Sequence, residues 1–187
     1  MMREILIGTN NQDKLKQFRL FFKQLNLDIK AHSLADLGIE DEVEEDLNSI
    51  LEIAKKKAKC YAEKSGVITL SDDLGLFVDA LGGEPGIHAK RWHEGTENDR
   101  CFKLQERLKD ISEKQRTAIY DPEKKEFWTY EGSIEGVISD EFKGSLGFGY
   151  DPIFKLPDGR HFAELSEEER NTISHRGKTI RKYLNRT

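Results

Sequence analysis

The sequence contains few of the residues that build disulfide frameworks or zinc sites. Cys60 and Cys101 are its only cysteines, and neither belongs to a CxxC pair or to a cluster of cysteine and histidine. A basic excess is also missing, because 30 Lys and Arg residues stand against 35 Asp and Glu residues, a net charge of -5. Long nucleic acid requires a basic surface that displaces counterions. These absences argue against a zinc protein, a disulfide-stapled domain and a nucleic-acid-binding protein, but not against a small anionic ligand.

Long apolar runs, internal repeats and Ser/Gly linkers are absent as well. The apolar run at residues 4–8 is too short for a signal-peptide core or a membrane span, so we expect a strand there and a cytoplasmic location. With 187 residues, of which 36% are hydrophobic, the chain can bury a core. We therefore expect a single domain over residues 1–187.

Strand and helix patterns alternate along the chain. The strand at residues 4–8 leads into a polar turn and then a helix over about residues 12–25, where apolar side chains recur at helical spacing. The other expected elements are strands over 27–32 and 67–70, helices over 47–64, 98–109 and 167–185 (the last interrupted near Asn171), and a hairpin or bent strand over 127–138 broken near Gly132. This alternation predicts an α/β domain around a mixed sheet.

Two adjacent carboxylates, Asp72 and Asp73, follow the strand at residues 67–70. Mg²⁺ takes oxygen ligands and keeps several waters, so one or two carboxylates together with substrate phosphates can hold it. Successive side chains on a strand point to opposite faces, so both carboxylates can reach one site only if the strand has ended, and Gly75 favours a turn there. The pair also fits an ordinary solvated turn or helix cap.

Two further segments could contribute to a metal or phosphate site. The acidic run at residues 40–46 could supply another metal ligand, or it could be the solvated N-terminus of the next helix. Residues 9–14 combine backbone amides at a helix N-terminus with Lys14 in the first turn, an arrangement that suits a triphosphate. The glycine spacing of a P-loop is missing, so this motif is weak on its own.

Residues 144–152 contain three glycines, which let the backbone come close to a ligand. Phe148 could offer an aromatic face to a base, and Asp151 could accept a hydrogen bond from a ring N–H or an amino group. The segment fits equally well a hairpin turn whose aromatic side chains fill the core.

Ser174, His175 and Arg176 place three polar side chains next to one another near the last helix. His175 and Arg176 can donate to a carbonyl oxygen or a phosphate, although such pairs are commonly surface residues. No nucleophile elbow surrounds Ser174, which argues against a serine hydrolase.

Taken in order, the motifs of this chain resemble those of the inosine triphosphate pyrophosphatase family. These house-cleaning hydrolases are also called noncanonical purine NTP pyrophosphatases or dITP/XTP diphosphatases. The motifs are Thr-Asn-Asn-x-x-Lys after the first strand, Ser-Asp-Asp-x-Gly-Leu, Leu-Gly-Gly-x-Pro-Gly-Ile, Gly-Phe-Gly-Tyr-Asp-Pro-Ile-Phe and Ile-Ser-His-Arg-Gly-Lys. The resemblance runs from residue 4 to about residue 183, and the last three motifs are the most specific.

The resemblance implies an elongated mixed α/β sheet with flanking helices, two lobes around a central substrate cleft, and a homodimer. It implies Mg²⁺-dependent attack of water on the α-phosphate of dITP, ITP or XTP, with release of pyrophosphate. Asp73 would bind the metal and act as the general base, with Asp72 as its support. Glu44, or Glu45 in its place, would be the second metal ligand.

The resemblance also implies which residues bind the substrate. His175 and Arg176 would read the 6-keto oxygen that separates hypoxanthine and xanthine from adenine. The other substrate contacts implied are Thr9, Asn11 and Lys14 on the phosphates, Phe148 stacked on the purine, Tyr150 and Asp151 around the base, and Asn10, Leu74, Gly149 and Arg170 as further contacts.

Four departures from the family pattern affect the expected base preference. Leu74 stands where Ser or Thr is common, Ile53 replaces Asn, and Arg170 replaces Lys. The strand over residues 116–121 is expected to be short, so that the sheet is trimmed there. Two alternatives remain: a Maf-type pyrophosphatase acting on modified or pyrimidine nucleotides, and a nucleotide-binding module that has lost catalysis.

Overall fold

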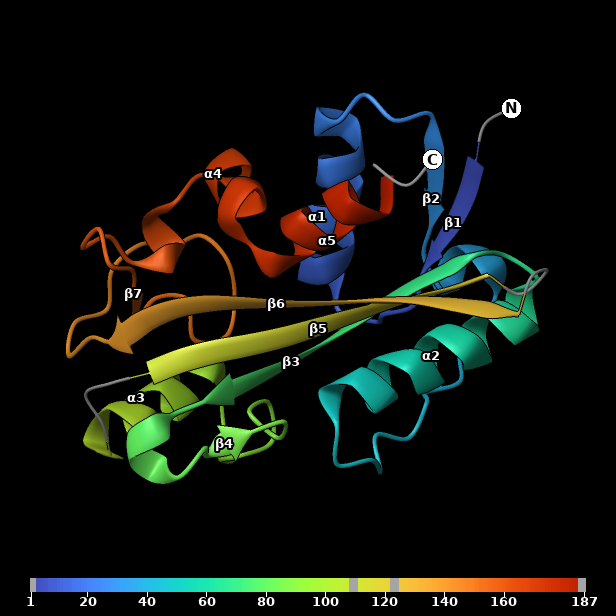
Figure 1. Ribbon diagram of the computed structural model, residues 1–187. Helices are drawn as coiled ribbons and strands as arrows, with labels where there is room; N and C mark the ends of the chain where they lie inside the picture. Colours follow the sequence, from blue (N-terminus) through green and yellow to red (C-terminus); the bar gives the residue numbers. More distant parts are fainter. Residues whose placement is uncertain (1–2, 108–110, 122–124, 185–187) are drawn as a thin grey trace. The chain divides into compact units, whose positions relative to one another are not determined.

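The structure, a computed structural model, describes residues 3–107, 111–121 and 125–184 (Figure 1). The chain divides into two units, each with its own core of buried apolar side chains. Unit 1 comprises Met1–Asp73, Arg116–Gly132 and Arg176–Thr187, and unit 2 comprises Leu74–Gln115 and Ser133–His175. The single domain expected over residues 1–187 stays a prediction.

The helices and strands of the described residues alternate as the sequence predicts. In chain order they are β1 (Arg3–Ile7), α1 (Gln12–Gln24), β2 (Ile29–His32), the 3₁₀ turn η1 (Ala35–Leu37), α2 (Ile50–Ser65), β3 (Thr69–Phe77), η2 (Asp79–Leu81), β4 (Pro85–Gly86), α3 (Glu97–Arg107), β5 (Ile111–Asp121), β6 (Glu126–Ile138), β7 (Phe154–Lys155), η3 (Phe162–Glu164), α4 (Glu167–Ile173) and α5 (His175–Leu184).

The strands form a mixed sheet in the order β2-β1-β3-β5-β6-β7, with β4 paired to β3. β1 runs parallel to β2 and to β3, whereas β3 with β4 and β6 with β7 are antiparallel pairs. An α/β fold with a mixed sheet and flanking helices is therefore confirmed. Within the described residues, no helix has the length and apolar character needed to cross a membrane.

In unit 1, β1 separates two layers of helix. Ile5 and Ile7 pack into one cluster with residues of α1 and with Ile180 of α5, whereas Leu6 packs with Tyr61 of α2. Figure 1 shows α1 and α5 together on one side of β3, and α2 on the other. The alternation of side chains along a strand thus gives the unit its two packed faces.

The first helix begins and ends where its sequence directs. Asn11 is the N-cap, and its side-chain oxygen accepts hydrogen bonds from the amides of Asp13 (2.9 Å) and Lys14 (3.1 Å). Apolar residues at helical spacing then bury one face, namely Leu15, Phe18, Phe21 and Phe22. The cap and the apolar stripe together account for the helix that the sequence predicts.

Unit 2 packs around a separate apolar cluster. Leu76 and Val78 at the end of β3 meet Leu104 of α3 and Ile134 of β6 there. The remaining buried members of the cluster are Ala89, Cys101, Ile138, Ile153, Phe154, Leu156, Phe162 and Leu165.

β3 corrects the expectation that the chain turns at the acidic pair. The strand continues through Asp72 and Asp73 to Phe77, with Gly75 inside it. Beyond Leu70, where pairing with β1 ends, the strand is paired further along with β4 through Leu76 and Phe77. Strand propensity disfavours Asp and Gly, but backbone pairing and side-chain contacts outweigh it here.

Three other expectations about elements were wrong. β5 is 11 residues long rather than trimmed, because it lies between β3 and β6 in the sheet, where backbone pairing rather than hydrophobicity sets its length. β6 passes Gly132 without a break. The interruption in the last helical segment falls at Ser174, the C-cap of α4, rather than near Asn171. The turn expected at residues 120–122 lies partly outside the described residues.

Candidate functional site

The turn between β1 and α1 lies against the start of β3. Gly8 donates its amide to the Leu70 carbonyl (2.8 Å), and Ser71 Oγ donates to the Gly8 carbonyl (3.2 Å). A Cβ at Gly8 would lie 2.2 Å from Ser71 Oγ, so a side chain at that position would push the turn away from β3. The turn that carries Thr9 and Asn11 is thereby fixed beside Asp72 and Asp73, at the carboxyl end of β1, where α/β proteins bind ligands.

Hydrogen bonds hold residues 9–14 together and connect them to β3 and to the acidic run. Thr9 Oγ1 accepts from the Asn11 amide (3.2 Å), and Asn11 in turn caps α1. Lys14 reaches β3, where its Nζ donates to the backbone carbonyl of Asp72 (3.3 Å). Asn10 is exposed, and its Nδ2 donates to Glu42 Oε1 (3.4 Å). The structure therefore brings Thr9, Asn11 and Lys14 together and leaves Asn10 at the surface.

Asp72 lies on the face of β3 that α1 and α5 cover. Its side chain is fully buried, and Oδ2 accepts from Arg176 Nε (2.8 Å) and lies 3.4 Å from Lys14 Nζ. Arg176 also donates from Nη1 to Gln17 Oε1 (3.1 Å). Two cations from two helices therefore neutralise a carboxylate that would be costly to bury alone. Sequence reasoning missed Gln17.

Asp73 lies on the opposite face of β3, toward α2. Its Oδ1 accepts from Lys57 Nζ (3.3 Å), and the same ammonium donates to Glu45 Oε1. Asp73 and Lys57 retain 13% and 15% of their side-chain exposure, and Glu45 retains 33%. Compared with Asp72, this carboxylate is open enough to meet a ligand.

Electrostatics distinguish the groups further. Burial raises the pKa of Asp73, and the charges of Lys57 and Lys14 offset this only in part. Burial lowers the pKa of Lys14, although Asp72 acts against it. Burial also lowers the pKa of Lys57, but the carboxylates of Asp73 and Glu45 outweigh burial and raise it overall. A carboxylate with a raised pKa is a better proton acceptor, so Asp73 suits a general base.

Two glutamates of the acidic run differ in their contacts. Glu45 meets Lys57 beside Asp73, whereas Glu44 is exposed. Among the described residues, no group of three or more His, Cys, Asp or Glu side chains is placed to hold a metal. A pair of carboxylates nevertheless fits Mg²⁺, which completes its shell with waters and substrate phosphates. The cation Lys57 already lies between these two carboxylates, which shows that the position attracts positive charge.

Lys57 is a second residue that sequence reasoning missed. It follows Ile53 by four residues and Ile50 by seven, and both isoleucines are buried in α2. A residue at this spacing faces the same side of the helix. A lysine on the buried side of an amphipathic helix was therefore a readable signal.

In unit 2, the loop at residues 144–152 is held by its own side chains. Asp151 Oδ2 accepts from the Phe148 amide (2.9 Å) and lies 4.0 Å from Nη1 of the buried Arg170. Gly147 has φ +85°, and a Cβ there would lie 2.0 Å from Asp151 Oδ2 and 2.6 Å from Arg170 Nη1. Only glycine fits this position, so the loop needs Gly147 to bring Phe148, Asp151 and Arg170 together.

Two side chains of α3 bind the backbone of Gly149 in the loop at residues 144–152. Glu97 Oε2 accepts from the Gly149 amide (2.9 Å), and Cys101 Sγ donates to the Gly149 carbonyl (3.4 Å). Glu97 and Cys101 are four residues apart and therefore lie on one face of α3. Tyr150 donates its hydroxyl to the Ala89 carbonyl (2.9 Å), and burial raises its pKa to about 12. Glu97 and Ala89 were not expected from the sequence.

Three further residues singled out from the sequence lie on β3, α2 and α5. Leu74 is half-buried in β3, and Ile53 is buried in α2. His175 begins α5, but its side chain lies outside the described part of the chain.

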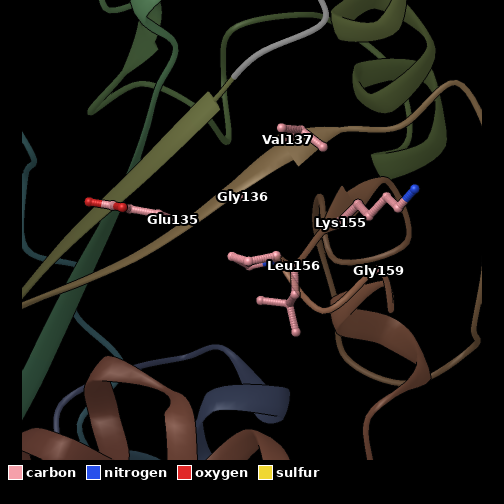
Figure 2. A pocket seen from close by; sticks show the side chains of 7 residues that line it. Glu135, Gly136, Val137, Lys155, Leu156 and Gly159 are labelled. Atoms are coloured by element: carbon pink, nitrogen blue, oxygen red, sulfur yellow. The ribbon is translucent and has the colours of Figure 1, made fainter.

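A pocket of about 530 Å³ opens elsewhere in unit 2, between β6 and the segment after β7 (Figure 2). Figure 2 shows the side chains of Glu135, Val137, Lys155 and Leu156 around it. The complete lining is Glu135, Gly136, Val137, Lys155, Leu156, Pro157 and Gly159, and none of these is an expected site residue.

Comparison with known proteins agrees with these motifs. Residues 5–186 match the sequence profile of the Ham1 family. A protein of Bacillus licheniformis named dITP/XTP pyrophosphatase is 38% identical, over 97% of this chain and 96% of that protein. The structure of a HAM1 protein from Coxiella burnetii matches with a TM-score of 0.86 at 31% identity, over 100% of both chains. The Staphylococcus aureus Ham1 protein matches with a TM-score of 0.82 at 31% identity, over 97% of this chain and 96% of that chain.

Proposed function

Because the chain belongs to the Ham1 family, we propose that it hydrolyses noncanonical purine nucleoside triphosphates to the monophosphate and pyrophosphate. The observation that carries the proposal is near full-length similarity to relatives named dITP/XTP pyrophosphatase. The resemblance to nucleotide pyrophosphatases predicted from the motifs is confirmed at the level of the family. The substrates dITP, ITP and XTP, and a role in cleaning the nucleotide pool, are part of the proposal.

Water is the nucleophile of the proposed reaction. Its oxygen attacks the α-phosphorus, the bond from that phosphorus to the bridging α–β oxygen breaks, and pyrophosphate leaves with the bond electrons. Asp73 accepts the proton of the water, a role that its raised pKa and its partial exposure support. Asp72 supports this chemistry from the other face of β3 by holding Lys14 and Arg176.

Asp73 and Glu45 are the residues that would hold Mg²⁺. The shared contact with Lys57 supports Glu45 over Glu44 as the second ligand. When bound, Mg²⁺ supplies charge neutralisation on the phosphates and lowers the pKa of a water. Lys14 adds a positive charge for the triphosphate, and Thr9 and Asn11 add short polar groups at the N-terminus of α1.

The proposed recognition of the base uses the side chains that the family resemblance implies. Phe148 stacks on the purine, and Asp151 fixes the backbone that presents it. His175 and Arg176 donate to the 6-keto oxygen. Adenine, with a 6-amino group, would leave such a donor unpaired, and mismatches of this kind can reduce kcat/KM by about 10⁴-fold.

A panel of nucleotides tests the proposal. Pyrophosphate release with Mg²⁺ should be fastest for ITP, dITP and XTP and much slower for ATP, GTP, dUTP and dTTP. Preference for dUTP or dTTP would point instead to a Maf-type activity. Binding of ITP without turnover of any nucleotide would identify a module that has lost catalysis. Omitting Mg²⁺ in a parallel series tests the metal requirement.

The family resemblance also predicts a homodimer in the cytoplasm. Light scattering of the purified chain tests the first prediction, and cell fractionation tests the second. A monomer at micromolar concentration would contradict the dimer.

A further inference from the structure

Lys57 occupies an unusual place for a lysine. It lies on the inward side of α2, four residues after the buried Ile53, and only 15% of its side chain is exposed. Its ammonium group contacts Glu45 Oε1 and lies 3.3 Å from Asp73 Oδ1. One side-chain cation therefore joins the two carboxylates that are proposed to bind the metal.

The carboxylates around the proposed metal site are already paired with side-chain cations. The carboxylates of Asp72, Asp73 and Glu45 are paired with three cations, namely Lys14, Lys57 and Arg176. Asp72 is already matched by Arg176 and Lys14 on the other face of β3. Lys57 is thus the cation paired with Asp73 and Glu45, and its single positive charge offsets one of their two negative charges.

From this arrangement we infer that Lys57 is an internal counter-ion of the metal site, bound between Asp73 and Glu45 in the metal-free chain and displaced when a divalent cation binds. The inference rests on the proposed function, because it takes these two carboxylates as metal ligands. It assigns to Lys57 a positioning role, since the residue acts through the two carboxylates.

Displacement follows from the shared atoms. Asp73 Oδ1 and Glu45 Oε1 are the oxygens that the ammonium contacts, and a hard divalent cation requires oxygen lone pairs of the same carboxylates. Two cations held by one pair of carboxylates would also repel each other strongly at such short range. The metal therefore has to compete with Lys57, which weakens its binding in the absence of nucleotide.

The preceding lysine provides a matched control. Lys56 is the neighbour of Lys57 in α2, and its ammonium group lies 2.5 Å from Asp46 Oδ1, a carboxylate of the same acidic segment. Lys56 and Asp46 are more exposed, at 36% and 50% of their side chains. A change at Lys56 removes the same charge from the same helix without touching the contact with Asp73.

The first test measures metal affinity without nucleotide. Mn²⁺ binding, followed by electron paramagnetic resonance, should be about tenfold tighter in Lys57→Met than in the wild type, because a competing charge is gone. Lys56→Met should bind as the wild type does, and adding Asp73→Asn to either protein should remove the tight site. Unchanged or weaker binding in Lys57→Met would overturn the inference, since Lys57 would then merely hold Glu45 in place.

The second test follows the displaced amine itself. In the wild type, saturating Mg²⁺ should increase the rate at which an amine-reactive reagent labels Lys57, measured by peptide mass spectrometry, and leave Lys56 unchanged. A Lys57 that is labelled no faster with Mg²⁺ would overturn the displacement. Pyrophosphate release by the wild type, measured in parallel, separates the two proposals. Turnover without tighter Mn²⁺ binding in Lys57→Met defeats only the counter-ion, and tighter binding without turnover of any nucleotide defeats only the proposed function.

Discussion

Two adjacent carboxylates, on opposite faces of β3, differ in burial and in their partners. Asp72 is fully buried between α1 and α5 and is held by Arg176 and Lys14. Asp73, one residue later, retains some exposure toward α2 and shares the Lys57 ammonium with Glu45. The alternation of a strand separates the pair, and burial then separates their chemistry. A closed ion pair favours structure, and a partly open one favours exchange with a ligand.

The largest expected effect is on the open face. Asp73→Asn should lower kcat for ITP by about 10³-fold or more, because it removes a proton acceptor and a metal ligand while preserving shape. Its midpoint of thermal unfolding should stay close to that of the wild type. A variant that kept most of its kcat would contradict the assignment of Asp73, and circular dichroism would show whether a loss of activity reflects a loss of fold.

The next effect is on the closed face. Asp72→Ala should lower the free energy of unfolding by about 3–5 kcal/mol, because Arg176 and Lys14 would remain near a site without their carboxylate. Urea denaturation measures this loss. A stability equal to that of the wild type would mean that the pairing with Asp72 contributes little. Asp72→Asn, which still accepts a hydrogen bond from Arg176, should lose less and serves as the matched control.

The third effect concerns Phe148 in unit 2, whose substitution leaves Asp72 and Asp73 unchanged. Phe148→Ala should raise KM for ITP by about tenfold, since stacking on a base is worth about 1–3 kcal/mol. Phe148 is half-buried, so the free energy of unfolding should fall less than in Asp72→Ala. The ratio of KM between Phe148→Ala and Phe148→Tyr measures the aromatic contribution. Equal KM values in all three proteins would remove Phe148 from the base contact.

The smallest effect is a difference between the two thiols. Burial raises the pKa of Cys101 to about 12, so this thiol should stay unreactive toward a disulfide reagent at pH 8. Cys60 in α2 is partly exposed and should react first. The same pattern in Asp73→Asn would show that unit 2 remains folded when turnover is lost. Rapid labelling of Cys101 in the native wild type would contradict its burial.

Local signals predicted the elements around Asp73 but not its contacts. Asn11 before an apolar stripe predicted α1, and the alternation of elements predicted the mixed sheet, because caps and helical spacing are encoded within a few residues. The continuation of β3 through the acidic pair was missed, since pairing with β4 and contacts from both helical layers outweigh local propensity. Long-range partners such as Gln17 and Glu97 become visible only when the chain folds, whereas the helical spacing of α2 already marks Lys57 as an inward-facing lysine.

The most direct test of the different roles of Asp72 and Asp73 is the rate of pyrophosphate release in variants of each. Pyrophosphate release from ITP at saturating Mg²⁺ should be compared under single-turnover conditions for Asp73→Asn and Asp72→Asn, at a temperature where both are folded. The account predicts that Asp73→Asn is at least about 100-fold slower than Asp72→Asn, because Asp73 accepts the proton and binds the metal, whereas Asp72 acts only through Lys14 and Arg176. An Asp72→Asn variant as slow as Asp73→Asn would contradict the division of roles between the two faces of β3.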